Sequence, residues 1–436
     1  MGLQFAQAGS VILGWEFYLP FALMLLLVAF AVPVWVALGM GSLGMLYFTN
    51  ALPLALIGEA LFEGIDAFAL IAIPLFVLTG DVLVRTGLSN KLLDIADATT
   101  AGFKSGFGTA TVLSCGLFAC ISGSDAAGAA AIGRMTIDRL VEQGYPKAYA
   151  CALVASGACT GILIPPSIAY IIIGLILGIS ASTLFLAAVV PGLLIMLTIM
   201  LTNVAMNRLH GFESSDRRFS FARWLRAIID GRYALMVPVV ILGGIYTGVF
   251  TPTEAAAVAA CSSIIIGLLQ GTLRVGDFPK MLESSAKVVG IIVPIIALSL
   301  PLAQTFAILQ IPQGFVKFAF SVSENPIVLL LIMIAILILA GCVMEAAPNI
   351  VILSPILFPL AREIGMHDIH FCIVMVTALG VGFITPPLGL NIFVVSSIAR
   401  EGVMPVAARC IPFVFSMLIT VLILAFIPEL SLWAIK

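Results

Sequence analysis

Charge is scarce in this sequence of 436 residues. Asp, Glu, Lys and Arg together make up only 10% of it, whereas 62% of the residues are hydrophobic. A soluble domain has about 25% charged and about 45–50% apolar residues. A soluble fold of this length has too little interior to bury so much apolar surface, so the composition predicts an integral membrane protein. The net charge of −2 comes without the basic stripe that marks nucleic-acid binding, and we expect no nucleic-acid partner.

Motifs of catalysis and nucleotide binding are also missing. The sequence has no P-loop, no nucleophile elbow and no H-E-x-x-H motif. We therefore expect neither an enzyme nor a user of ATP, and no cofactor. Energy for any transport must then come from an ion gradient or from a partner. An intramembrane protease would need clustered His or paired Asp residues on facing helices, which we do not find.

Cysteine and histidine show no metal-binding pattern. None of the eight cysteines belongs to a C-x-x-C pair, so we expect them to pack as small core residues. His367 and His370 have the spacing of a weak metal pair, but they fall in a predicted outer loop without further ligands nearby. We interpret both as residues of a solvated loop and expect no transition-metal site.

Long apolar runs, by contrast, are abundant. A spanning helix needs roughly 20 apolar residues, and the runs predict ten crossings. Two further apolar segments, 106–135 and 328–361, are each interrupted midway by small and polar residues. Because neither half is long enough to span, we expect both segments to be re-entrant helical hairpins. The predicted crossings are 17–38, 42–62, 67–84, 147–179, 183–207, 234–250, 253–272, 288–309, 371–399 and 404–429.

One polar segment divides the chain. Residues 208–233 are rich in arginine, and Lys and Arg favour cytoplasmic loops. We expect a first unit over 1–207, a basic cytoplasmic linker over 208–233 and a second unit over 234–436. With ten crossings, all but three of the twenty Lys and Arg residues fall on the cytoplasmic side, and both termini lie outside.

The two units carry the same signature. GILIPP (161–166) and GFITPP (382–387) each follow a predicted hairpin at a similar distance, which makes 147–179 and 371–399 broken helices. Five crossings per unit is an odd number, so the second unit is inverted relative to the first. The predicted fold is an all-α integral membrane protein with two inverted repeats of five crossings, each with one re-entrant hairpin. Such repeats are typical of secondary transporters, and the paired hairpins argue against a channel.

The Pro–Pro breaks and the hairpin tips are the places where ligands can bind. Two consecutive prolines end a helix, which frees carbonyls for a hard cation such as sodium and presents a helix N-terminus to an anion. At the first tip, Ser122 and Ser124 flank Gly123, and their oxygens suit a small cation. A plain kink and a close-packing turn are the structural alternatives.

Two ionisable residues occupy the tips. Asp125 ends the interruption of the first hairpin and Glu345 begins that of the second, and ionisable groups at membrane depth are functional candidates by default. Each could coordinate a cation, carry a proton or pair with Arg134, or it could be solvated if its tip reaches the interface. Asp125 is also a candidate to face the substrate.

Polar residues near the breaks complete the set of candidates. Thr160 and Thr385 could bind ions or satisfy freed carbonyls. Thr160, Ser167 and Asn391 are further candidates to face the substrate. The segment GVFTPTE (248–254) is interpreted as a structural helix start, because Thr251 can cap the helix that Pro252 begins.

Five ordered motifs resemble a known family. SGSDAAGAAAIGRM, GILIPPSIAYIIIG, GVFTPTEAAAVAA, GCVMEAAPNIVILSPILFPLAREIG and GVGFITPPLGLNIF are similar to the large membrane subunit of tripartite ATP-independent periplasmic (TRAP) transporters. A more distant likeness is to sodium-coupled dicarboxylate carriers of the same ion-transporter superfamily. The resemblance implies an elevator-type, sodium-driven importer of the bacterial inner membrane. Its substrate would be a C4-dicarboxylate, sialic acid or another sugar or keto acid.

The resemblance also implies partners and ion sites. The partners are a separate small four-helix membrane subunit and a periplasmic substrate-binding protein, although a carrier without a binding protein stays open as an alternative. Asp125 departs from the family, in which this position is often small and uncharged. The first implied sodium site comprises Ser122, Ser124, Gly161, Ile164 and Pro166. The second comprises Met344, Glu345, Gly382, Thr385 and Pro387.

Overall fold

The computed structural model describes residues 14–30, 32–49, 55–213, 219–387 and 389–435, and these residues form helices without any strand. The first half contains α1 (Trp15–Ala29), α2 (Val34–Thr49), α3 (Ala55–Ile65), η1 (Phe68–Ile71), α4 (Ala72–Arg85), α5 (Leu88–Thr100), α6 (Gly106–Ser122), α7 (Asp125–Glu142), α8 (Lys147–Ala158), α9 (Thr160–Leu163), α10 (Ile168–Leu177) and α11 (Ala181–His210). The second half contains α12 (Phe221–Asp230), α13 (Arg232–Tyr246), α14 (Pro252–Leu269), η2 (Val275–Asp277), α15 (Phe278–Ile308), α16 (Ile311–Val322), α17 (Pro326–Gly341), α18 (Ala346–Glu363), α19 (Asp368–Gly382), α20 (Leu390–Ala399), α21 (Val403–Phe426) and α22 (Glu429–Leu432).

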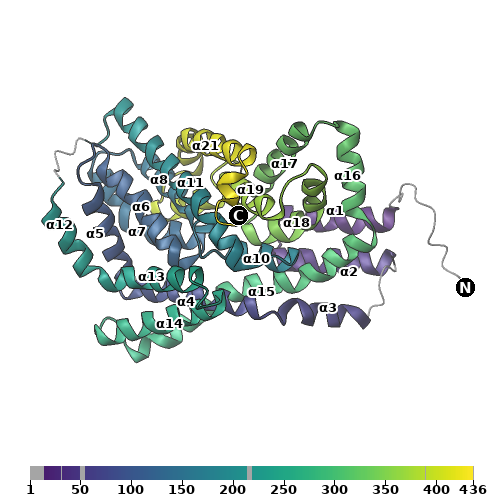
Figure 1. Ribbon diagram of the computed structural model, residues 1–436, viewed down its shortest axis with the longest axis horizontal. Helices are drawn as coiled ribbons and strands as arrows, with labels where there is room; N and C mark the ends of the chain where they lie inside the picture. Colours follow the sequence, from purple (N-terminus) through teal and green to yellow (C-terminus); the bar gives the residue numbers. More distant parts are fainter. Residues whose placement is uncertain (1–13, 31, 50–54, 214–218, 388, 436) are drawn as a thin grey trace, which may run out of the picture.

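The molecule is elongated (Figure 1). Helices α5, α6, α7 and α12 lie at one end of its long axis, and α1, α2, α3 and α16 lie at the other. The 31-residue helix α15 connects the two ends, because it packs against α4 as well as against α2 and α3. Helices α19 and α21 lie between the ends.

One order of elements occurs in both halves. A helical hairpin (α6–α7, then α17–α18) is followed by an interrupted helix (α8–α10, then α19–α20) and by a long helix (α11, then α21). The two long helices pack together, and hydroxyl groups join them: Thr198 with Thr420, and Thr202 with Ser416, each at 2.8 Å between oxygens. The two halves therefore meet along α11 and α21, and the interrupted helices lie close to this contact.

The first two predicted crossings have the wrong boundaries. The structure ends α1 at Ala29 and begins α2 at Val34, inside the predicted crossing 17–38, and it divides the predicted crossing 42–62 between α2 and α3. Pro33 explains the first difference, because a proline disfavours helical backbone in the residue before it and suits the start of the next helix. Helices α5, α12 and α16 were not among the predicted elements.

Several helices are long and apolar enough to cross a membrane. Five single helical segments in the described part of the chain qualify, and the α8–α10 helix qualifies as a span bent by 41°. This bend is the break predicted within 147–179. Helix α13 overlaps the predicted crossing 234–250, but it forms its bent pair, at 70°, with the charged helix α12. The number of ten crossings stays a prediction. The five segments are Phe68–Arg85, Ala181–His210, Pro252–Leu269, Val275–Ile308 and Val403–Phe426.

The segment GVFTPTE forms the helix start that its sequence indicates. The Thr251 hydroxyl accepts a hydrogen bond from the Glu254 backbone N–H, and the Glu254 carboxylate accepts one from the Thr251 backbone N–H at 2.8 Å. Pro252 occupies the first helical turn of α14. This reciprocal capping satisfies two backbone donors and gives the segment a structural role.

Candidate transport site

The first hairpin turns within two residues. Helix α6 ends at Ser122, Gly123 adopts a left-handed conformation with φ +60°, and Ser124 caps α7 by accepting a hydrogen bond from the Ala127 backbone N–H at 3.4 Å. A left-handed residue is strained unless it is glycine. The turn therefore depends on Gly123, and it holds the oxygens of Ser122 and Ser124 at the tip.

This tip lies directly on the first helix break. The Gly123 carbonyl accepts a hydrogen bond from the Ile168 backbone N–H at 3.2 Å. A Cβ atom added to Gly161 would lie 2.7 Å from the Ser124 carbonyl oxygen and from the Asp125 nitrogen. Only a glycine at position 161 lets the two backbones approach so closely. Of the implied first sodium site, the structure thus brings Ser124 and Gly161 into contact.

The first break is closed and buried. Pro165 and Pro166 are both buried, and their peptide bond is cis, as is that of the second Pro–Pro pair. The Pro166 carbonyl oxygen lies beside Gly123, 2.8 Å from the position of an added Cβ. Ile164 has an extended backbone and a buried side chain. The main-chain groups of the break therefore face the hairpin tip and are shielded by it.

Two hydroxyl groups satisfy carbonyls at this break. The Thr160 hydroxyl donates to the Gly157 carbonyl, and the Ser167 hydroxyl donates to the Ile162 carbonyl, each at 2.7 Å. Both side chains are fully buried. Because each hydroxyl proton is used inside the protein, only the oxygen lone pairs of Thr160 and Ser167 are left for a cation.

The second hairpin meets the second break in the same way. The Cys342 carbonyl accepts a hydrogen bond from the Gly389 backbone N–H at 3.1 Å. A Cβ atom added to Gly382 would lie 2.6 Å from the Gly341 Cα atom. The Thr385 hydroxyl donates to the Val381 carbonyl at 2.7 Å, so here too a hydroxyl satisfies a carbonyl near the break.

The second break is more open than the first. Pro386 and Pro387 are exposed, and so is Glu345 at the hairpin tip. Of the implied second sodium site, Gly382 lies at the junction between hairpin and break. Among the described residues, no hydrogen bond joins Glu345 or Met344 to Thr385 or Pro387.

Asn349 is a candidate that the sequence analysis missed. Its side-chain amide donates to the Met344 carbonyl at 2.9 Å and to the Ala340 carbonyl at 3.2 Å. The residue is fully buried, and its Oδ1 atom has no hydrogen-bond partner among the described residues. In the sequence, Asn349 is part of the interruption EAAPN of the second hairpin, and nothing there shows that its amide is buried. A free amide oxygen at a tip suits a hard cation.

The two breaks also contact each other. The Asn391 side-chain amide donates to the Ala155 carbonyl at 3.3 Å, and the Cys159 thiol donates to the Gly380 carbonyl at 3.2 Å. In the described part of the chain, neither Oδ1 of Asn391 nor Oδ2 of Asp125 has a hydrogen-bond partner. The second half thus contributes Asn391 to the first junction.

A small cavity separates the two hairpin tips. It has a volume of about 60 Å³, which is room for a cation or a few water molecules and less than ligand pockets usually offer. We call it the tip cavity. Ser124 and Asp125 line it from the first tip, Glu345 from the second, and Ile168 from the half-helix after the first break. Of the other predicted residues, Thr160, Ser167, Thr385 and Asn391 do not line it.

A larger chamber adjoins the tip cavity. It has a volume of about 340 Å³, which is within the range of small-molecule sites. Ser122 and Ser124 of the first tip, Glu345 of the second tip and Arg134 of α7 line it, together with residues of α4 and α15. Because Ser124 and Glu345 belong to both spaces, an organic ion in this chamber would lie against the tips.

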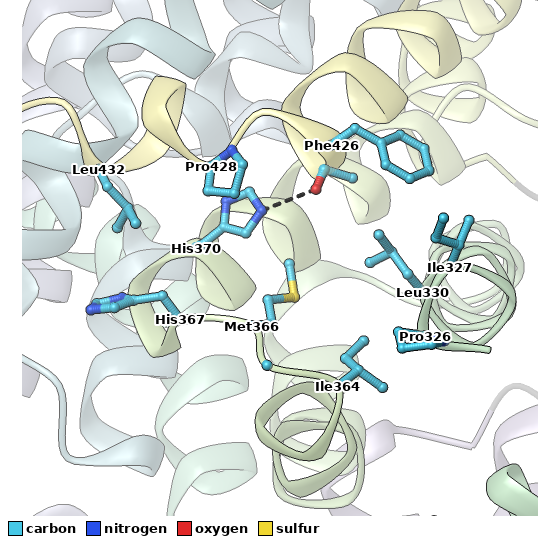
Figure 2. A pocket seen from close by; sticks show the side chains of 12 residues that line it. Pro326, Ile327, Leu330, Ile364, Met366, His367, His370, Phe426, Pro428 and Leu432 are labelled. Carbon is cyan, nitrogen blue, oxygen red and sulfur yellow. Dashed lines mark hydrogen bonds between the residues drawn. The ribbon is translucent and has the colours of Figure 1, made fainter. Parts of the chain in front are cut away.

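A third cavity, of about 420 Å³, lies between α17, α19 and the end of α21 (Figure 2), and no residue of either break lines it. Its lining includes His367 and His370, and the interpretation of both as residues of a solvated loop is wrong for His370. His370 is buried in the first turn of α19, where its Nε2 atom lies 3.2 Å from the Ala425 carbonyl oxygen. His367 caps the same helix by accepting a hydrogen bond from the Ile369 backbone N–H. No cluster of three His, Cys, Asp or Glu residues in the described ranges could hold a metal ion.

Two solved proteins share this arrangement of helices. The fold matches the crystal structure of the Alcanivorax borkumensis YdaH transporter with a TM-score of 0.64 at 15% identity, over 95% of this chain and 98% of that one. It also matches the Neisseria gonorrhoeae efflux pump MtrF with a TM-score of 0.60 at 14% identity, over 96% of each chain. At these identities the likeness shows a common fold only.

The family follows from the sequence. Residues 21–430 match the model of the tripartite ATP-independent periplasmic transporter, DctM component. The C4-dicarboxylate TRAP transporter large permease protein DctM of Pseudomonas aeruginosa is 37% identical over 85% of this chain and 87% of its own length. The chain belongs to the DctM family of large TRAP permease subunits and is a multi-pass protein of the inner membrane.

Relatives in this family are named for different cargoes. The isethionate TRAP transporter permease protein DctMQ of Oleidesulfovibrio alaskensis is 34% identical over 95% of this chain, which spans 65% of the length of that relative. The 2,3-diketo-L-gulonate TRAP transporter large permease protein YiaN of Escherichia coli is 28% identical over 94% of this chain and 96% of its own length. Their names share one chemical feature, because each cargo is a small organic anion.

Proposed function

We propose that this chain is the large permease subunit of a sodium-coupled transporter that imports a small carboxylate delivered by a periplasmic binding protein. A separate small four-helix membrane subunit completes the complex. The two halves act as inverted repeats, and both hairpins move with both broken helices as one elevator-like unit.

The tip cavity is the observation that supports this proposal most strongly. Two hairpin tips from distant parts of the sequence meet there beside a broken helix, and Ser124, Asp125 and Glu345 contribute oxygens. Asp125 keeps one oxygen without a hydrogen-bond partner in the described structure. Oxygen atoms are the ligands of hard cations, and irregular backbone at membrane depth is tolerated where it lines a cavity.

The two ion sites are proposed at the two junctions. At the first, Ser122, Ser124, Gly161, Ile164 and Pro166 contribute mainly through hydroxyl and carbonyl oxygens. At the second, the carbonyls of Met344, Gly382 and Pro387, the hydroxyl of Thr385 and the carboxylate of Glu345 do so. Asn349 joins this second set, because its free amide oxygen lies at the same tip.

Uptake into vesicles tests the proposal. The chain is reconstituted with the small subunit and the binding protein of the same organism, and uptake of succinate, isethionate and 2,3-diketo-L-gulonate is measured. We expect uptake of at least one of these anions to require an inward sodium gradient and to stop when potassium replaces sodium. Uptake that is independent of sodium would disprove the coupling, and uptake by the chain alone would favour the carrier without a binding protein.

Two substitutions test the ion sites without disturbing the folding of the chain. Ser124→Ala and Thr385→Val each remove one hydroxyl from a junction, and both should raise the sodium concentration needed for half-maximal uptake while membrane insertion is unchanged. Unaltered sodium dependence in both variants would remove these residues from the proposed sites.

A further inference from the structure

One cation, Arg134, lines the chamber and has no protein partner among the described residues. Arg134 lies on α7, ten residues after Ser124, and its side chain is exposed to the chamber. A helix rises about 1.5 Å per residue, so the two positions are about 15 Å apart along α7. Within the described part of the chain, the Arg134 guanidinium makes no hydrogen bond, ion pair or cation–π contact.

The other charges of the chamber do not neutralise Arg134. Asp81 pairs with Arg85, four residues further along α4, with 2.9 Å between Oδ2 and Nε. Glu345, the remaining acidic residue of the lining, belongs to the hairpin tip and makes no ion pair with Arg134 in the described structure. The chamber therefore has an anionic side chain at the tips and an uncompensated guanidinium further along α7.

The surroundings strengthen the attraction of Arg134 for an anion. Phe118, Val288 and Ile291 give the chamber apolar walls, and Ala127 and Ala130 leave its α7 side open because their side chains are small. Electrostatic attraction is stronger where water is displaced by such walls. A guanidinium offers a rigid fork of donors that matches a carboxylate, or another planar or tetrahedral oxyanion, in a bidentate manner.

We propose that Arg134 binds an acidic group of the transported molecule, a carboxylate or a sulfonate, within the chamber beside the hairpin tips. This inference rests on the proposed function and adds to it a residue that selects the charge of the cargo. The acid binds to Arg134, while the rest of the molecule extends toward Ser122 and Ser124. A neutral analogue of the same size then lacks its strongest contact.

Arg139 provides the matched control. It lies on the same helix and is exposed, but it does not line the chamber, and its guanidinium stacks over the Phe107 ring with 4.5 Å between Cζ and the ring centroid. Arg134→Gln and Arg139→Gln therefore remove the same charge from α7, and only the first removes it from the chamber.

Equilibrium binding to the purified full-length chain tests the assignment. Binding of radiolabelled succinate, isethionate and 2,3-diketo-L-gulonate is measured in detergent at constant ionic strength, with the melting temperature of each variant as a folding control. For any anion that the unaltered chain binds, Arg134→Gln should weaken binding by roughly 10- to 100-fold, as expected for a charge-assisted hydrogen bond. Arg134→Lys should lose less, because it keeps the charge without the fork, and Arg139→Gln should bind like the unaltered chain.

The possible failures point to different conclusions. If the unaltered chain neither binds nor, with its partners, transports any of the three anions, the proposed function fails. If it binds one of them and Arg134→Gln binds it equally well, only the role of Arg134 fails. If Arg134 merely balanced Glu345, the double variant Arg134→Gln, Glu345→Gln would regain binding, and that result would also overturn the inference. If Arg134→Gln fails to fold, the affinity of Arg134→Lys is the test. An affinity equal to that of the unaltered chain would contradict bidentate binding of the anion by the Arg134 guanidinium.

Discussion

The two hairpin–break junctions are built alike but differ in how far they are closed. At the first, Pro165 and Pro166 are buried and the tip carries small residues; at the second, Pro386, Pro387 and Glu345 are exposed. Rigid, shielded main-chain groups can hold a ligand without rearranging, whereas exposed groups must be ordered when it binds, at an entropic cost. If the proposed ions bind at these junctions, the first is preformed and the second becomes ordered when its ion binds.

We expect the largest loss of sodium affinity from substitutions of the glycines at which each hairpin contacts its helix break. Gly161→Ala places a methyl group 2.7 Å from the Ser124 carbonyl oxygen, and overpacking of this kind costs about 1–3 kcal/mol. We expect the sodium affinity to fall by roughly 5- to 150-fold, measured as the sodium concentration for half-maximal uptake. Gly382→Ala clashes with the α17 backbone at Gly341 and Ile338, but the break that follows Gly382 is exposed and can shift, so its effect should be smaller. Equal losses in the two variants would contradict the comparison.

A control for these variants lies in α13. A Cβ atom added to Gly243 has no heavy atom within 4 Å, and alanine is the better helix former by about 1 kcal/mol. Gly243→Ala should therefore leave sodium dependence unchanged and should not lower the melting temperature.

Asn349 tests the second junction alone. Asn349→Ala removes the donor that satisfies the Met344 and Ala340 carbonyls, and buried acceptors left unpaired cost about 1–3 kcal/mol. We expect sodium-dependent uptake to fall by about tenfold, with the second tip becoming more accessible to protease or to hydrogen exchange while the first tip keeps its protection. Loss of protection at both tips would show that the junctions form one cooperative unit.

Ser124 tests the first junction more gently. Ser124→Ala removes a helix cap worth about 1 kcal/mol as well as one hydroxyl ligand, so the sodium concentration for half-maximal uptake should rise by about fivefold. Ser220 caps α12 in the same manner, through the Arg223 backbone N–H at 3.5 Å, far from both tips. Ser220→Ala should leave the sodium response unaltered, and a comparable shift in that variant would remove the ligand role of Ser124.

We expect the smallest effect on sodium affinity from a substitution at the base of the first hairpin, where Tyr145 contacts Glu213. The buried Glu213 carboxylate accepts hydrogen bonds from the Phe107 backbone N–H and from the Tyr145 hydroxyl, each at 3.0 Å. Burial, together with the neighbouring Glu213, raises the pKa of Tyr145 above its usual range, so the phenol stays protonated and keeps donating. Tyr145→Phe should lower the melting temperature slightly without changing sodium affinity, and a large change in affinity would mean that the base of the hairpin affects its tip.

The sequence predicted the parts that depend on local chemistry. Paired prolines, a glycine between serines and a Thr–Pro–Thr–Glu helix start each impose a backbone shape by themselves, and the structure has a break, a turn and a cap at those positions. Apolar runs predicted the helix boundaries less well. A single proline such as Pro33 is itself apolar and does not interrupt the run, although it ends one helix and begins the next. Helices α5 and α16 lacked the length of a crossing and were missed.

Contacts between residues far apart in the sequence could not be predicted from local sequence patterns. Nothing near position 349 indicated that an amide would fold back onto the Met344 carbonyl, and nothing near Arg134 indicated a chamber, since its walls come from α4, α6, α7 and α15. Likewise, His370 was predicted to lie in a solvated loop, but α22 and the end of α21 cover it in the structure. Burial of a polar side chain is decided by tertiary packing, which spacing along the chain does not encode.

The bonds between the halves also bear on how the chain is made. Cys159 finds its acceptor in Gly380, and Asn391 finds its own in Ala155, so partners are separated by more than two hundred residues. While the ribosome is still synthesising the second half, the first broken helix lacks the hydrogen bonds that Gly380 and Asn391 will make with it. Biogenesis of the protein must therefore protect an incomplete centre until residue 391 has emerged, and a chain cut short before that point would be a natural substrate for membrane quality control.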